Sequence, residues 1–380
     1  MVHLRTPENR LNSAPGGYTS AIPSRPRTAL VLGGGGISGA AYEAGCLAAL
    51  EEVFGEGFCR RAFDIYVGVS AGAIIASLVA GGISPLRLRD DILNERKTNF
   101  NFQRSDVYRF DLRGFLQTTW DATRRMTGVL NAFRREGLSF SLLDLADLLQ
   151  ELLPSGCFSL EPLEGYLRNV LVDQGMGNAF HDLEHKLYVP AIDLDQANRV
   201  VFGDPEWADV PISEAVVASC AIPAFFQPWK IGNRSFVDGC MGGVCHLDVA
   251  IDRGATRLLV INPMVPFDAG PERSSIRSLA TGKACGIADM GITFVSDQAL
   301  RIMGRDRLEH ALRAARQDHP EVEIALIEPS RSEPLLFVHG PMSFEARARI
   351  LHYAYESTLT ELRDHADEVA ALLDTPRLHA

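Results

Sequence analysis

A run of four glycines at residues 33–36 constrains the fold of this 380-residue chain more than any other feature of its sequence. The apolar segment before it, residues 28–32 (TALVL), is typical of a buried strand. The small residues at 38–53 are typical of a helix that packs closely on a sheet. A glycine turn between the two lets another group approach the backbone, because no side chain stands in the way. That group could be a phosphate or the oxyanion of an ester under attack.

A second unit of the same kind follows the first. The segment at residues 63–69 (FDIYVGV) predicts a strand that ends at Ser70, and residues 71–80 predict another small-residue helix. Two successive strand–turn–helix units are typical of a parallel α/β fold. Further strands are expected at 186–192, 199–202, 235–237, 257–261 and 323–327, and further helices at 211–219, 275–317 and 343–374.

The sequence predicts one elaborated α/β domain. Residues 1–27 are polar and rich in Pro, Ser and Arg, which is typical of a disordered tail. The α/β domain is expected at 28–330, with a helical cap inserted at 85–180, where no clear strand is found. Residues 331–380 are expected to form C-terminal helices that pack on this domain.

Composition narrows the range of partners and locations. The formal net charge of −11 argues against a nucleic-acid ligand, which requires a basic face. The seven cysteines are scattered without a C-x-x-C pair, so they predict reduced, buried thiols and no metal site. The sequence contains neither a secretory signal nor 18 consecutive apolar residues, so a cytoplasmic location is expected.

The inserted cap differs in charge from the whole chain. Residues 86–135 contain 11 Lys and Arg against 6 Asp and Glu, although the chain is acidic. A basic helical cap could make peripheral contact with an anionic membrane surface. A solvated helix face has the same composition, and both interpretations stay open.

The glycine run matches only half of a dinucleotide-binding fingerprint. Gly34, Gly36 and Gly39 satisfy the pattern G-x-G-x-x-G after a strand. A dinucleotide fold also requires an acidic residue at the end of the second strand, where it binds the ribose hydroxyls. Here that strand ends at Ser70, and its only acidic residue, Asp64, lies at its beginning. A nucleotide-binding oxidoreductase is therefore the least favoured function.

The second strand leads instead into the pattern G-x-S-x-G, formed by Gly68, Ser70 and Gly72. In this pattern a serine occupies a sharp turn between strand and helix, so that its hydroxyl projects from the edge of the sheet. Neighbouring parallel strands end side by side, so the N–H groups of Gly35 and Gly36 could face an acyl group attacked by Ser70. The sequence thus predicts a serine nucleophile with an oxyanion hole.

A serine nucleophile needs a base. Asp238 follows the strand expected at 235–237 and precedes Gly239, which places it at another strand end. Taken alone, an Asp before a Gly is more often a turn residue. His246 is a spare candidate base, although a solvent-facing loop histidine is the simpler interpretation.

Together these motifs resemble those of the patatin-like phospholipases, acyl hydrolases that use a Ser–Asp dyad. The glycine turn at 34–39 is similar to the oxyanion loop of that family, and the segment 68–72 (GVSAG) to its nucleophile elbow. Asp238-Gly239 is similar to its second catalytic motif. Two further stretches, 219–223 (SCAIP) and Asp193-Leu194, are similar to other family segments. The resemblance extends from about residue 28 to at least 262.

The resemblance implies a fold, a site and a reaction. The implied fold is a three-layer α/β sandwich with a mostly parallel central sheet, helices on both faces and a helical cap. The implied site consists of a catalytic pair and the glycines around it: Ser70, Asp238, Gly34, Gly35, Gly36, Gly68 and Gly72. The substrate would be a lipid or another acyl ester, and neither a metal nor an organic cofactor is implied.

Two positions depart from the family pattern. Ser38 stands where the family has Arg or Lys, and Cys240 stands where it has Gly or Ala. The leading hypothesis is a serine acyl hydrolase of the lipase or phospholipase A type, with an acyl-Ser70 intermediate and Asp238 as base. The alternatives are a catalytically weak lipid- or acyl-chain-binding protein and an acyltransferase on the same fold.

Overall fold

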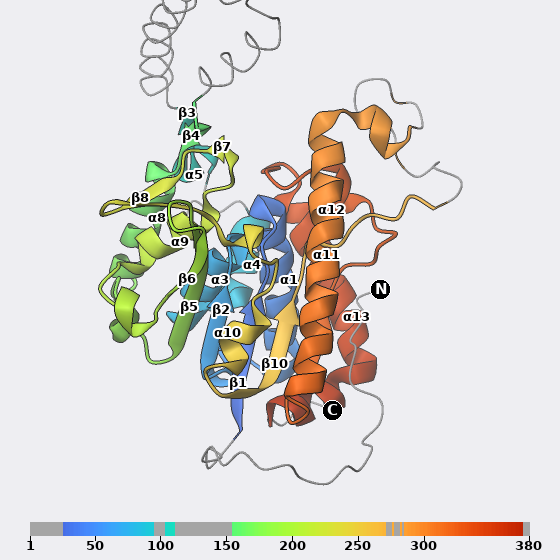
Figure 1. Cartoon of the computed structure of the whole chain (residues 1–380). Coiled ribbons are helices and arrows are strands. Elements are labelled where there is room, and N and C mark those ends of the chain that lie inside the picture. The colour runs from blue at the N-terminus through green and yellow to red at the C-terminus, as the bar shows by residue number, and fades with distance from the viewer. Residues whose placement is uncertain are drawn as a thin grey trace, which may run out of the picture.

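The computed structural model describes residues 26–94, 103–110, 154–270, 276, 282 and 285–374. Its centre is an eight-stranded sheet with the order β11-β10-β1-β2-β5-β9-β8, in which β6 also pairs with β5 (Figure 1). The strands are β1 (Arg27–Leu32), β2 (Ile65–Gly68), β5 (Lys186–Asp193), β6 (Asn198–Phe202), β8 (Trp229–Ile231), β9 (Arg234–Asp238), β10 (Ala255–Ile261) and β11 (Glu323–Ile327).

Five neighbouring strands of this sheet are parallel, and the other three pair antiparallel. Strands β11, β10, β1, β2 and β5 run in the same direction. Strands β6 and β9 run antiparallel to β5, and β8 runs antiparallel to β9. The mostly parallel sheet predicted from the sequence is therefore confirmed, and its antiparallel edge carries Asp238.

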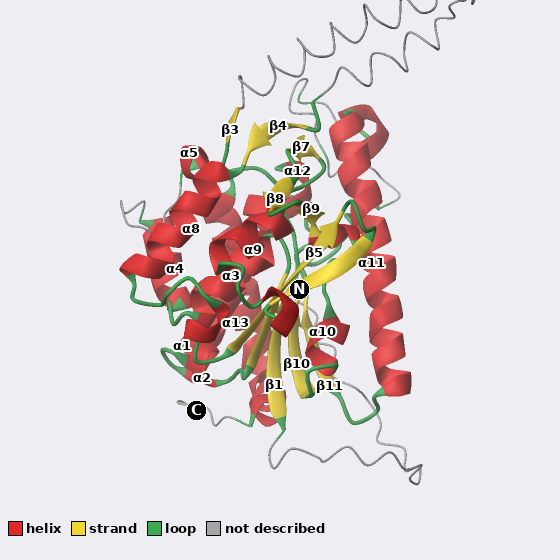
Figure 2. Cartoon of the chain, turned by 60° about the vertical axis from the view of Figure 1, so that its left-hand side comes forward, coloured by secondary structure: helices red, strands yellow, loops and turns green. Residues whose placement is uncertain are grey.

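Helices cover both faces of the sheet. In β1, Leu30 and Leu32 belong to a core shared with α1, α3, α4, α9 and α13, whereas Ala29 and Val31 belong to a second core shared with α10 and α11. Figure 2 shows α11 on one side of the strands and α1, α3 and α4 on the other. This alternation along the strand confirms the three-layer sandwich.

A small residue in α1 (Gly36–Phe54) allows close packing with another helix, α13 (Arg347–Leu373). A Cβ on Gly45 of α1 would clash with the backbone of Leu351 in α13, so a glycine allows these two helices to pack closely. The helices are α1 (Gly36–Phe54), α2 (Phe58–Arg61), α3 (Ala71–Ala80), α4 (Pro85–Leu93), α5 (Arg104–Val107), α8 (Glu161–Asp173), α9 (Ile212–Cys220), α10 (Leu247–Ile251), α11 (Ile292–Asp318), α12 (Leu335–Val338) and α13 (Arg347–Leu373). Short 3-10 turns lie at η1 (Phe180–Asp182), η2 (Pro205–Trp207), η3 (Gly239–Met241) and η4 (Ile287–Met290). None of the helices described is long and apolar enough to cross a membrane.

The segment expected to be wholly helical also contains strands. Strands β3 (Arg109–Phe110) and β4 (Gly156–Ser159) join β7 (Ala224–Phe226) in a separate three-stranded sheet. Tyr108 packs against Phe158, Phe225 and Phe226, with ring centroids 5.0 to 5.9 Å apart. These strands are too short to show a periodic pattern, and aromatic packing holds them together.

Several predictions fall outside the described residues. They concern residues 1–25 of the expected tail and most of the basic segment 86–135. The C-terminal helix expected at 343–374 corresponds to α13, and the helix expected at 275–317 corresponds to α11, which begins at Ile292. The division into domains stays a prediction.

Candidate active site

Ser70 occupies a strained turn between β2 and α3. Its φ of 53° and ψ of −122° belong to a region that residues with a side chain rarely adopt. A Cβ on Gly68 would clash with the backbone of Gly72, and a Cβ on Gly72 would lie 2.5 Å from the carbonyl oxygens of β1 and the turn after it. Both flanking glycines are therefore required for the turn to close against its neighbour.

Ser219 of α9 holds this turn in place. The backbone N–H of Ser70 donates a hydrogen bond to Ser219 Oγ at 2.9 Å, and the Ser219 hydroxyl donates to the Pro190 carbonyl at 2.6 Å. Ser219 is fully buried. The sequence pointed to this residue only as part of the stretch 219–223, because a bond between α9 and the turn depends on tertiary packing.

Strand register brings Asp238 to the same level as Ser70. Val67 of β2 pairs with Tyr188 of β5, and β5 continues to Ala191, which pairs with Asp238 of β9. Ser70 lies three residues beyond Val67, as Ala191 lies three beyond Tyr188. Because β9 runs antiparallel to β5, its last residue, Asp238, lies at the edge of the sheet where the parallel strands end.

The two side chains form a hydrogen bond at this edge. The Ser70 hydroxyl donates to Asp238 Oδ2 at 2.6 Å, and the side chains are only 3% and 1% exposed. The backbone N–H of Cys240 donates to Asp238 Oδ1 at 2.8 Å, which fixes the carboxylate plane. Burial raises the pKa of Asp238 to about 6, although the hydrogen bonds from Ser70 and Cys240 oppose this shift. The carboxylate is therefore a stronger base than an exposed aspartate.

The glycine loop lies next to the turn at Ser70, because Leu32 of β1 pairs with Gly68 of β2. The N–H of Gly34 donates to the Val244 carbonyl at 3.2 Å, so it already has an acceptor. Gly36 has a φ of 61°. Within the described part of the chain, the N–H groups of Gly35 and Gly36 donate no hydrogen bond.

The loop is packed from several sides, which fixes its conformation. A Cβ on Gly34 would clash with Sγ of Cys240, and a Cβ on Gly35 would lie 3.1 Å from Cγ of Pro263. A Cβ on Gly36 would lie 2.5 Å from the Pro341 carbonyl oxygen. Cys240 therefore packs against this loop, while its N–H binds Asp238.

Ser38 connects the loop to the C-terminal part of the chain. Its hydroxyl donates to the Gly340 carbonyl at 2.7 Å, and its N–H donates to the Pro341 carbonyl at 3.1 Å. The side chain is 1% exposed. Where the resemblance leads one to expect a cation, this chain has a buried hydroxyl that anchors the segment before α13.

The remaining candidates have structural contacts. His246 is buried, not solvent-facing, and its ring nitrogens contact Gly239 O at 3.2 Å and Arg199 Nη1 at 3.0 Å. Burial and the charge of Arg199 lower the pKa of His246 to about 4, so its ring is neutral at pH 7. Asp193 accepts hydrogen bonds from Arg234 and from backbone N–H groups beyond the end of β5. Asp64 lies at the start of β2, where it accepts a hydrogen bond from the N–H of Thr28.

Comparison with known proteins assigns the family. The family model of the patatin-like phospholipases matches residues 30–251, which is more than half of the chain. The match includes the glycine loop, the turn at Ser70 and Asp238. The chain therefore belongs to the patatin-like phospholipase family, as the sequence motifs suggested, and this membership supports a lipid-hydrolase activity in the broad sense.

Individual relatives are distant. No curated protein matches the chain. VipD from Legionella pneumophila is similar with a TM-score of 0.36 and 16% identity, over 90% of this chain and 67% of VipD. ExoU, in the ExoU–SpcU complex from the type III secretion system of Pseudomonas aeruginosa, is similar with a TM-score of 0.31 and 18% identity. That similarity covers 90% of this chain and 60% of the ExoU chain.

Proposed function

We propose that this protein is a serine acyl hydrolase that cleaves carboxylic esters of lipids. The observation that carries the proposal is the buried hydrogen bond of 2.6 Å from the Ser70 hydroxyl to Asp238, made at a strained turn. A serine that is only structural does not require such a backbone conformation, whereas strain at a turn is common where a nucleophile must be presented.

The proposed reaction has two steps. Ser70 Oγ attacks the ester carbonyl carbon as its proton passes to Asp238 Oδ2, and the N–H groups of Gly35 and Gly36 stabilise the oxyanion. The carbon–oxygen bond to the alcohol breaks, and the alcohol leaves with the proton from Asp238. Water then gives a proton to Asp238 and attacks the acyl-Ser70 ester, and Ser70 recovers its proton as the fatty acid leaves.

Hydrogen bonds and the pKa of Asp238 support the role given to each group in this reaction. Gly34 belongs to the proposed oxyanion loop, but its N–H is bonded to Val244, so we assign the donor role to Gly35 and Gly36. Asp238 must be ionised to act as base, and the raised pKa matches its affinity for a proton to that task. The reaction needs neither a metal ion nor an organic cofactor.

The test is labelling and turnover by the variant Ser70→Ala. Wild-type protein should react with a fluorophosphonate probe and hydrolyse a p-nitrophenyl ester, whereas S70A should do neither. Ser77→Ala is the matched control, because Ser77 is buried in α3, the helix that follows Ser70, and donates to the Ile74 carbonyl. If S70A keeps the wild-type rate, Ser70 is not the nucleophile.

The alternatives on this fold predict different products. An acyltransferase would transfer the acyl group from Ser70 to an added alcohol faster than to water, which product analysis with glycerol measures. A lipid-binding protein without turnover would bind lipid but leave the probe unreacted. We favour turnover over binding alone, because the Ser70 hydroxyl is hydrogen-bonded to a buried carboxylate that can accept its proton.

A further inference from the structure

Two segments from the C-terminal half of the chain border the glycine loop. Ser38 binds the first of them, the 335–341 segment, through its hydroxyl and its N–H. The second, the 262–267 segment, follows β10, and Cγ of its Pro263 lies 3.1 Å from the place that a Cβ on Gly35 would take. The conformation of the loop therefore depends on where these two segments lie.

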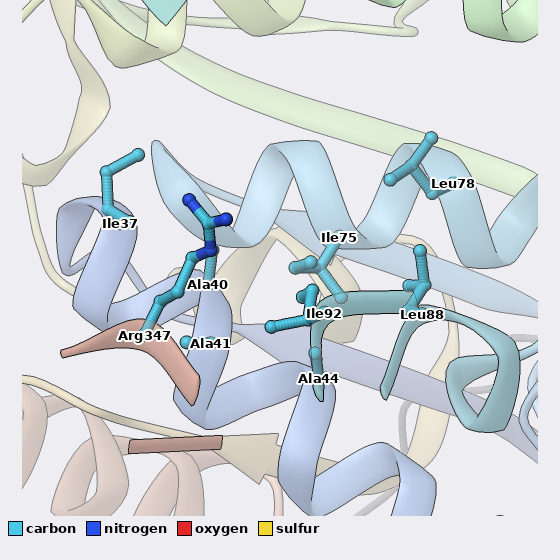
Figure 3. Close-up of a pocket in the computed structure, with 9 residues that line it drawn as sticks. All are labelled: Ile37, Ala40, Ala41, Ala44, Ile75, Leu78, Leu88, Ile92 and Arg347. Atoms are coloured by element: carbon cyan, nitrogen blue, oxygen red, sulfur yellow. The ribbon is translucent and has the colours of Figure 1, made fainter. Parts of the chain in front are cut away.

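The helix that begins at the loop packs on apolar side chains. Ile37 and Ala40 of α1 line a small pocket together with Ile75 of α3 (Figure 3). Apolar packing has no preferred direction, so it does not by itself set the direction of the N–H groups in the loop. Hydrogen bonds are directional, so the segment that accepts them from Ser38 helps to determine how the loop is held.

A buried arginine of α11 binds both segments. Arg301 Nη1 donates a hydrogen bond to the Val265 carbonyl at 3.2 Å, and Nη2 donates to the Leu336 carbonyl at 3.2 Å. Its Nε donates to Asp297 Oδ2 at 2.8 Å, one turn earlier in α11. The side chain of Arg301 is only 2% exposed. One planar guanidinium therefore fixes the two segments relative to each other.

Neighbouring contacts support the same arrangement. The side chain of Gln298 in α11 exchanges two hydrogen bonds with the backbone of Phe267, at 2.7 and 3.1 Å. The rings of Phe267 and Phe337 stack with centroids 5.4 Å apart, and the Arg301 guanidinium lies 6.0 Å from the Phe337 centroid. Buried ion pairs can often be replaced by apolar side chains without loss of stability. Packing alone therefore does not account for an arginine at this place.

We propose that Arg301 is a positioning residue for the oxyanion hole, and this inference rests on the proposed function. By joining the two segments, Arg301 holds the glycine loop so that the N–H groups of Gly35 and Gly36 face the acyl group on Ser70. Donors must be held accurately, since a displacement of about 1 Å can lower a rate about a hundredfold. The family resemblance leads one to expect a cation inside the loop, at position 38, whereas here a cation of α11 acts on the loop through the segments that border it.

The test compares Arg301→Met with Arg253→Met in the full-length protein. Arg253 is the matched control, because it also donates to a carboxylate, that of Asp204, and to a backbone carbonyl, that of Val249. It precedes β10 and so lies at the edge of the sheet opposite to Ser70. The assay measures kcat for an uncharged p-nitrophenyl ester, per site labelled when the fluorophosphonate reaction is complete.

In R301M, we expect kcat per labelled site to fall about ten- to hundredfold through the displaced N–H donors. The pH dependence of kcat/KM should not change, because Asp238 keeps its contacts with Ser70 and Cys240. In R253M, kcat should stay within about twofold of wild type, although both variants lose a partly or fully buried ion pair.

Hydrogen exchange measures the loop itself and does not depend on turnover. In R301M, the hydrogen-bonded N–H groups of residues 33–39 should exchange about tenfold faster or more, whereas those of β2 should be unchanged. Pro263→Ala removes the ring beside Gly35 and leaves Arg301 in place, so it should have the same two effects. P263A replaces R301M if that variant does not fold.

Two results would overturn the proposal. One is a wild-type kcat per labelled site in folded R301M, or in P263A if R301M does not fold. The other is an equal fall of kcat in R253M, which would assign the loss to general destabilisation. If wild type itself neither reacts with the probe nor hydrolyses the ester, the proposed function fails. Unchanged exchange of residues 33–39 in the variant would show separately that Arg301 does not hold the loop.

Discussion

Asp238 should destabilise the folded protein at neutral pH, and its removal should therefore stabilise it. Burial raises the pKa of Asp238 to about 6, whereas an unfolded aspartate has a pKa of about 3.9. A group whose pKa is raised on folding favours the folded state below pH 4, and this contribution is lost as pH rises through 6. At about 1.36 kcal/mol per pKa unit, the shift corresponds to about 3 kcal/mol.

The variant Asp238→Asn removes the charge and keeps the shape. Its amide oxygen can accept from the Cys240 N–H, and its amide nitrogen can donate to Ser70 Oγ in place of the present bond. We expect D238N to be as stable as wild type at pH 4 and up to about 3 kcal/mol more stable at pH 8. Urea unfolding at five pH values between 4 and 8 measures this difference.

Asp193→Asn is the contrasting control. Asp193 is buried, but hydrogen bonds from the backbone and from Arg234 outweigh the effect of burial and lower its pKa. D193N removes the carboxylate that pairs with Arg234, so it should lose about 1–3 kcal/mol at pH 8 and less at pH 3. If D238N gains no stability between pH 4 and pH 8, the ionised carboxylate of Asp238 is not penalised by burial and the reasoning is refuted.

The same pKa predicts the pH dependence of turnover. If ionised Asp238 is the base, kcat/KM should rise about tenfold per pH unit below 6 and level off above it. Measurement with an uncharged ester isolates this group, since the substrate does not titrate. D238N should be inactive at every pH, although it is the more stable protein at pH 8.

Three further substitutions test the framework of the site. Ser219→Ala leaves the Ser70 N–H without an acceptor in the core. It should lower the free energy of unfolding in urea by about 2–4 kcal/mol and should also lower kcat. The control Ser77→Ala should lower the free energy of unfolding by about 1 kcal/mol or less. Gly36→Ala places a Cβ at a φ of 61° and 2.5 Å from a carbonyl oxygen, so kcat should fall about a hundredfold through the displaced N–H donor. Ser38→Ala removes one buried hydrogen bond and should lower the free energy of unfolding by about 1 kcal/mol. We expect KM to change more than kcat. Equal changes in KM and kcat would mean that the substitution has displaced the glycine loop.

The sequence predicts the site best where the chemistry is local. The glycine loop and the turn at Ser70 each follow a strand and precede a helix, so pattern and spacing alone place them side by side. The sequence shows that Asp238 lies at the end of a strand, but it does not show in which direction that strand, β9, runs in the sheet. Its arrival beside Ser70 depends on the antiparallel pairing of Ala191 with Asp238, which is set by tertiary contacts.

The sequence does not reveal contacts between segments that are far apart along the chain. The bond between Ser38 and Gly340 joins residues 302 positions apart, and nothing in the local pattern of either predicts it. His246 has the surroundings of a turn in the sequence, yet packing beneath Gly239 buries it. The strands β3 and β4 are too short for a periodic signal. In each case tertiary packing decides the outcome.

The contacts of Ser38 also bear on which part of the chain determines substrate preference. The match to the family ends at residue 251, but Gly340 and Pro341 hold the glycine loop, and α13 packs closely on the helix that follows the loop. The proposed nucleophile and base thus lie within the matched region, whereas the segment that holds the glycine loop lies outside it. Ser38 therefore couples the glycine loop to the C-terminal segment, because its hydroxyl and its N–H both bind that segment. Substrate selection in this protein should consequently respond to substitutions after residue 335 that leave the hydrogen bond between Ser70 and Asp238 intact.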